Sequence, residues 1–159
     1  MKITVLGCSA VELSNARLSS FLIDDNLLLD AGTIGTALDQ RQQEKIKYIL
    51  LTHAHFDHIK DLPFFADDMG FNNKKRHVKV ISIPEVIRAL KNNVFNNVIW
   101  PDFTVLPDAE DPVIRLESIN ADKTFDVDGY KVTAYKVDHT VPAVAYLIGD
   151  KKGKKLLYM

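Results

Sequence analysis

The residues most able to do chemistry gather in one short segment of the chain. Three of the five histidines lie in the segment HAHFDH, residues 53–58, directly after an apolar run that is typical of a buried strand. Residues two apart at the end of a strand point the same way, so His53 and His55 can offer their imidazoles to one point. Asp57 and His58 lie past the bend and can face a neighbouring point. The spacing therefore predicts a site for two metal ions.

A divalent metal ion explains why so many imidazoles would share one place. Imidazoles and a carboxylate that were buried without partners would cost several kcal/mol in desolvation. Neutral imidazoles around Zn²⁺, Fe²⁺ or Mn²⁺ avoid that cost, whereas the alternative is a solvated histidine-rich loop. A first ion at His53 and His55 needs a third nitrogen ligand and an open position. His139, at the end of an apolar alternating run, is the candidate, because His77 follows basic residues in an evidently exposed loop.

The composition describes one ordinary globular domain over residues 1–159. The chain is 47% hydrophobic and 26% charged, with 20 basic against 21 acidic residues. A net charge of −1 supplies no bulk attraction for polyanions, so we do not expect a nucleic-acid partner. The basic runs at residues 74–76 and 151–155 are interpreted as solvated loops. One cysteine, no secretory signal and no transmembrane run together favour the cytoplasm, without a membrane partner.

The hydropathy pattern predicts a layered α/β protein in which strands outnumber helices. Helices are expected over residues 34–45, after the histidine segment as far as Gly70, and from Pro84 onward. The pair Asp128-Gly129 between alternating runs indicates a hairpin. The expected strands cover residues 3–6, 19–23, 27–29, 47–51, 78–83, 113–119, 124–127, 130–137, 143–148 and 156–159.

These motifs resemble a known family. The segment HAHFDH after YILLT, with LLLDAGT upstream, is similar to the metallo-β-lactamase fold of binuclear metallohydrolases. More narrowly, VLGCS, SSFLIDD, LTHAHFDHI, NNVIWPDFT and DHTVPAVAYLI resemble the branch of bacterial class II 3′,5′-cyclic-nucleotide phosphodiesterases. The resemblance runs from Lys2 to about Leu157. It implies an αββα sandwich that is incomplete at its carboxyl-terminal end.

The resemblance also assigns roles to individual residues. The implied metal ligands are, for a first ion, His53, His55 and His139 and, for a second, Asp57 and His58. Asp30 would lie beneath the site and orient the ligands. In the family, the last strand continues into a turn whose aspartate bridges the two metal ions, and another histidine ligand follows later in the chain. This sequence stops just before that turn. We therefore expect two divalent ions in the intact fold, zinc ahead of iron or manganese, and as few as one in this chain.

The leading hypothesis is a metal-dependent phosphodiesterase that hydrolyses a small cyclic nucleotide with a metal-bridged hydroxide. Asp57 is the catalytic candidate, although the proton donor is left open between it and the family's bridging aspartate. An alternative on the same fold is an endonuclease for RNA 3′ ends, which a His-x-Val-Pro segment and Asp61-Leu62-Pro63 resemble. An alternative of another class is an inactive metal-binding module that self-associates through a strand edge at residues 156–159.

Overall fold

The protein has a mixed α/β fold, which confirms the predicted class. The computed structural model describes residues 1–71 and 77–159, and the solvated loop expected at residues 72–76 lies outside this range. Two β-sheets make up the centre of the molecule. None of the helices in the described ranges has the length and apolar character needed to cross a membrane.

The larger sheet contains six strands in chain order, from β1 to β6. The first three strands pair antiparallel, as the predicted meander requires, and the third to the sixth pair parallel. The third strand is fully buried, because a strand in the middle of a sheet with both faces covered can be apolar at every position. The strand bounds are β1 Ile3–Gly7, β2 Ser20–Ile23, β3 Leu27–Leu29, β4 Tyr48–Leu50, β5 Val78–Ser82 and β6 Ile114–Ser118.

The helices occupy the connections between the parallel strands. Such crossovers are right-handed, which places their helices on one face of the sheet. The longest amphipathic helix begins at Pro84, where the missing N–H of proline costs nothing, and buries Val86 and Leu90. The helix bounds are α1 Gln40–Gln43, α2 Phe56–Ile59, α3 Leu62–Phe71 and α4 Pro84–Asn93.

The helix predicted over residues 34–45 is wrong over most of its length. Only α1 is helical, because Asp39 caps it: the Asp39 carboxylate accepts the N–H of Gln42, and the Gln42 side chain accepts the N–H of Asp39. Before this cap the chain runs as a loop that is buried as far as Ile34, whose N–H is accepted by Asp61 at 2.6 Å. The extended backbone of Asp39, with φ −71° and ψ 167°, interrupts the expected helix, so only the residues after this cap are helical.

The smaller sheet contains four antiparallel strands in the order β10-β9-β8-β7. The predicted hairpin is confirmed, since Asp128 and Gly129 both have positive φ, at 48° and 88°, as a tight hairpin turn requires. Strand β10 lies at one edge of this sheet and pairs with β9, and its Leu157 is 57% exposed. The strand bounds are β7 Thr124–Val127, β8 Tyr130–Val137, β9 Ala143–Gly149 and β10 Lys155–Tyr158.

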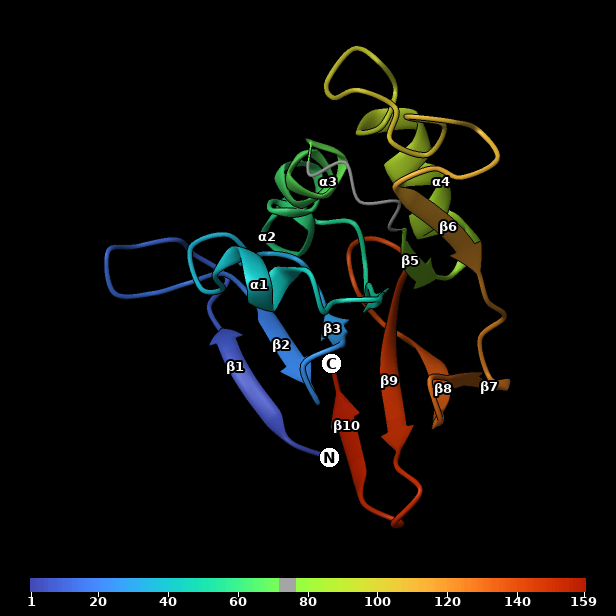
Figure 1. Ribbon diagram of the computed structural model, residues 1–159. Helices are drawn as coiled ribbons and strands as arrows, with labels where there is room; N and C mark the ends of the chain where they lie inside the picture. Colours follow the sequence, from blue (N-terminus) through green and yellow to red (C-terminus); the bar gives the residue numbers. More distant parts are fainter. Residues whose placement is uncertain (72–76) are drawn as a thin grey trace.

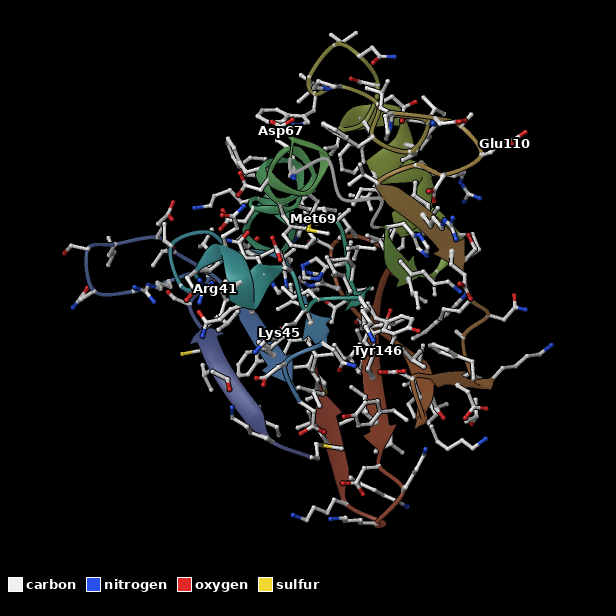
Figure 2. All side chains as sticks on the ribbon, viewed as in Figure 1. Arg41, Lys45, Asp67, Met69, Glu110 and Tyr146 are labelled. Atoms are coloured by element: carbon white, nitrogen blue, oxygen red, sulfur yellow. The ribbon has the colours of Figure 1, made fainter. Side chains whose placement is uncertain are left out.

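The main core lies between the two sheets, and helices cover the outer face of the larger one. In Figure 1 the helices gather on one side of the molecule and strands β7 to β10 on the other. Figure 2 shows Tyr146 of β9 in the interior, and its hydroxyl donates to the Leu51 carbonyl at 2.8 Å. The Val144 N–H likewise donates to the Thr52 carbonyl at 3.0 Å. These two bonds fix β9 against the end of β4, where the histidine segment begins.

Candidate metal centre

Three strand ends bring the candidate ligands together. The histidine segment follows β4, and His55 is the residue directly before α2. Asp30 follows β3, the parallel neighbour of β4, so both lie at the carboxyl edge of the larger sheet. His139 follows β8 in the smaller sheet. Packing of the two sheets therefore brings residues that are distant in sequence to one edge.

His53, His55 and His139 form a compact group. One ring nitrogen from each lies within 4.8 Å of the others, and Nε2 of His139 is 3.3 Å from Nδ1 of His55. The His53 ring lies 4.8 Å from the His55 ring and 4.7 Å from the His139 ring, between centroids. His53 is buried and His139 is exposed, so the group opens to solvent on one side. Three imidazole nitrogens with an open fourth position suit a zinc ion that keeps a site for water or substrate.

Asp57 and His58 form a second donor pair beside this group. The Asp57 Oδ2 lies 3.4 Å from His58 Nε2, and the His58 ring centroid is 4.1 Å from that of His53. The two side chains are 27% and 15% exposed, so both reach the surface of the same region. The carboxylate and imidazole fit a second divalent ion next to the first.

Asp30, for which the resemblance implies a supporting role, lies against Thr52 and His58. It is fully buried and has a φ of 54°, a conformation that asparagine and aspartate tolerate better than most residues. Its carboxylate accepts the Thr52 N–H at 2.8 Å and the Nδ1–H of His58 at 2.7 Å. The Thr52 hydroxyl lies 2.9 Å from this carboxylate and 2.9 Å from Nδ1 of His53.

Sequence reasoning missed two polar groups of this network, Thr52 and Tyr158. The hydroxyl of Tyr158 donates to Asp30 Oδ2 at 2.9 Å. The signal that could have revealed Thr52 is a hydroxyl residue between a fully apolar strand and the first histidine, where a buried polar group needs a partner. No local pattern identifies Tyr158, because its partner lies 128 residues away.

The pKa values of His53 and His58, the two histidines nearest Asp30, shift in opposite directions. Burial, followed by the charge of His58, lowers the pKa of His53 to about 4 despite the opposing charge of Asp30. Burial also lowers the pKa of His58, but the hydrogen bond and charge of Asp30 outweigh it and leave this pKa raised. His53 is therefore neutral at physiological pH, which is the form that binds a metal ion.

The ligands line an open pocket of about 540 Å³. Besides the histidines and Asp57, its walls include Ala10, Val137, Ala143 and Met159. A larger cavity of about 780 Å³ lies at the opposite, amino ends of β4 and β5, lined by charged side chains such as Lys47 and Lys79. We assign the site to the smaller pocket, because open α/β sheets bind ligands at the carboxyl ends of their strands.

Solved structures share this architecture. Unliganded yeast PDE1 matches with a TM-score of 0.82 and 17% identity, covering 98% of this chain and 63% of that one. The short form of human tRNase Z matches with a TM-score of 0.66 and 20% identity, covering 99% of this chain and 68% of that one. At these identities the likeness shows the fold alone.

Relatives found by sequence are named Ribonuclease Z. The protein of Methanococcus aeolicus is 28% identical over 112 residues, which are 70% of this chain and 33% of that protein. The chain spans from a third to a half of the length of the curated relatives it matches. These names overturn our expectation that nucleic acid is not a partner. That expectation is wrong because net charge sums over the whole surface, whereas a nucleic acid contacts only part of it.

The family match includes every candidate site residue. A domain described as the Beta-lactamase superfamily domain matches residues 25–159. This range includes Asp30, the histidine segment and His139. The chain therefore belongs to the beta-lactamase superfamily and has the metallo-β-lactamase fold.

Proposed function

We propose that this chain carries the metal centre of a phosphodiester hydrolase that acts on RNA, at or near a 3′ end. The observation that carries the proposal is the pair of adjoining donor sets, His53, His55 and His139 beside Asp57 and His58, in one open pocket. The names of the sequence relatives favour RNA as the substrate class. This chain spans a third to a half of the length of those relatives.

In this proposal the protein holds two divalent ions, with zinc as the first candidate. Bound ions would lower the pKa of a water molecule for attack on phosphorus and offset the charge of the phosphate. His53, His55 and His139 hold one ion through ring nitrogens, and Asp57 and His58 hold the other. Because His53 stays neutral down to about pH 4, protons do not compete for it at neutral pH.

Asp57 can also carry a proton in the reaction. Its carboxylate is 27% exposed and reaches the pocket, so it can exchange protons with a leaving oxygen as well as bind an ion. Asp30 cannot do this, because it is fully buried and its oxygens already accept hydrogen bonds from Thr52, His58 and Tyr158. The chemistry therefore belongs to Asp57 and the positioning to Asp30.

A small cyclic nucleotide is the second candidate substrate, favoured by the motifs NNVIWPDFT and DHTVPAVAYLI. The two candidates differ in size, since RNA needs surface beyond the pocket and a cyclic nucleotide does not. Both are phosphodiesters and would use the same metal ligands. A direct comparison of the two substrates on the same protein preparation separates them.

The test uses the purified chain loaded with zinc or manganese and two substrates, an RNA with a 3′ extension and 3′,5′-cyclic AMP. We expect RNA cleavage that is abolished by His139→Ala and unchanged by His77→Ala. His77 is a matched control, because it is exposed and lies 3.5 Å from Asp111, outside the metal centre. Hydrolysis of cyclic AMP without RNA cleavage would overturn the RNA proposal. Metal-loaded protein that cleaves neither substrate would overturn the hydrolase proposal.

A further inference from the structure

Tyr158 makes a hydrogen bond that links the two sheets beneath the metal centre. It lies on β10 at the edge of the smaller sheet, yet the residue is only 8% exposed and its side chain turns inward. Its hydroxyl donates to Oδ2 of Asp30, which follows β3 of the larger sheet, at 2.9 Å. The ring is held by Phe21 of β2 in an edge-on contact with centroids 5.2 Å apart. Both the ring and the hydroxyl of Tyr158 are therefore fixed.

Oδ2 of Asp30 is shared among the Tyr158 hydroxyl, Nδ1 of His58 and the Thr52 hydroxyl, which lies 2.9 Å away. Nδ1 of His58 lies 2.7 Å from this same oxygen, while Oδ1 of Asp30 accepts the N–H of Thr52 at 2.8 Å. A carboxylate with donors on both oxygens has one orientation, and a buried carboxylate that loses a donor must compensate by moving. Any rotation of Asp30 is passed to the His58 ring through this short bond.

The orientation of His58 decides what the second donor pair can bind. With Nδ1–H donated to Asp30, Nε2 of His58 is the free nitrogen, and it lies 3.4 Å from the Asp57 carboxylate. The first group is one step further from Asp30. His55 and His139 contact each other at 3.3 Å, and His53 is reached through the Thr52 hydroxyl. That hydroxyl lies 2.9 Å from Oδ2 and 3.1 Å from Oδ1 of Asp30, so it keeps an acceptor when the carboxylate turns. A change at Tyr158 should therefore affect the two donor sets unequally.

We propose that Tyr158 is a positioning residue for the second metal ion, acting through Asp30 and His58. The inference rests on the proposed function, in that it assumes two metal ions at these donor sets. Partners that orient metal-binding histidines change metal affinity by about 10- to 100-fold when they are removed. A loss of affinity at only one of the two adjoining metal sites distinguishes this role from a general contribution of Tyr158 to folding, which would weaken both sites.

The experiment is a competition titration of metal-free protein with Zn²⁺ and with Co²⁺, comparing wild type, Tyr158→Phe and Tyr146→Phe. Tyr146 is a matched control, because it pairs with Tyr158 across β9 and β10 and its buried hydroxyl donates to the Leu51 carbonyl instead of Asp30. We expect Tyr158→Phe to weaken the second ion by about 10- to 100-fold and to leave the first unchanged. Tyr146→Phe should bind both ions like the wild type, because the Leu51 carbonyl still accepts the Ser82 hydroxyl and β9 is still joined to Thr52 through the Val144 N–H.

The outcomes separate this inference from the proposed function. Two ions bound alike by wild type and Tyr158→Phe would overturn the inference and leave the two-metal centre intact. Equal weakening of both ions, or the same weakening in Tyr146→Phe, would also overturn it. A wild-type chain that binds no second ion would overturn the two-metal proposal itself. A second measurement needs no variant and uses imidazole nitrogen NMR of the metal-free wild type. We expect the tautomer of His58 that carries its proton on Nδ1. A proton on Nε2 instead would overturn the inference.

Discussion

At the scale of single residues, the Thr52 hydroxyl orients the ring of His53 through a hydrogen bond to Nδ1. This hydroxyl has one hydrogen, which it can give to Asp30 while accepting Nδ1–H from His53, both at 2.9 Å. This arrangement leaves Nε2 of His53 free for a metal ion. We expect Thr52→Val, which keeps the shape and removes the hydroxyl, to lower the affinity of the first ion by about 10- to 100-fold in a zinc competition titration.

Thr33→Val is the matched control for this variant. The Thr33 hydroxyl is buried and has no hydrogen-bond partner among the described residues, so its removal should leave zinc affinity and stability nearly unchanged. A Thr52→Val protein that binds zinc as tightly as Thr33→Val would show that His53 needs no support from the hydroxyl.

His53 also predicts a pH dependence of the metal-free protein. Its pKa is lowered to about 4 in the folded state, against 6.5 for an ordinary histidine. As pH falls from about 6.5 toward 4, the unfolded chain takes up a proton at residue 53 that the folded chain does not. We expect the free energy of unfolding of the wild type to fall in this window relative to His53→Gln, measured by urea unfolding with chelator present. If the free energies of unfolding of the two proteins differ by the same amount at every pH in this window, the lowered pKa of His53 is contradicted.

At the scale of elements, the loop after β3 and helix α2 behave as one unit. The Ala31 N–H donates to the His58 carbonyl at 2.7 Å, and Asp61 accepts the N–H groups of Ile34 and Gly35 at 2.6 and 3.1 Å. Gly32 allows this close approach, because a Cβ there would lie 2.0 Å from the Asp57 carbonyl oxygen. The loop that carries Asp30 and the helix that carries Asp57 and His58 are thereby held in a fixed relation.

Gly32→Ala should separate these two elements. We expect a loss of about 1–3 kcal/mol in the free energy of unfolding, typical of overpacking, together with weaker binding of the second metal ion. Gly35→Ala is the control, since a Cβ at Gly35 meets nothing within 4 Å, and it should change stability by less than about 1 kcal/mol. Urea unfolding and zinc titration measure both effects, and similar behaviour of the two variants would show that the contact at Gly32 is not limiting.

At the scale of the whole molecule, the lysine-rich turn and the metal centre lie at opposite ends of the smaller sheet. The turn at residues 150–154 connects β9 to β10, and the seven residues of β9 span about 20 Å between it and the pocket. Figure 1 shows this turn at the end of the molecule that is far from α2. The lysines of the turn are therefore too distant to contact a phosphate that is bound at the histidines.

The double substitution Lys152→Ser with Lys154→Ser tests this separation. Both side chains are exposed, and the turn is held by backbone N–H groups of these residues that donate to Asp150, so the fold should be retained. We expect RNA cleavage and its dependence on salt to be unchanged. A weaker salt dependence would mean that RNA contacts the turn after all, because each lost phosphate contact lowers the slope of log affinity against log salt by about 0.7 to 0.9.

Local patterns predicted most of the strands, whereas apolar spacing alone failed for one helix. The Asp128-Gly129 hairpin needs only two residues that accept positive φ, so its sequence was sufficient to identify it. The helix expected over residues 34–45 was wrong over most of its length, because Asp39 has an extended backbone and caps a shorter helix together with Gln42. Apolar spacing does not report such a cap.

The sequence by itself determined the histidine segment, its place after a buried strand and the family to which the chain belongs. These are local features, since the alternation of side chains along a strand is set by backbone geometry. Only the tertiary structure decided that Tyr146 meets Leu51 across 95 positions and that Tyr158 meets Asp30 across 128. Those contacts depend on how two sheets pack, and packing is set by burial summed over the whole core, which no single segment of sequence contains.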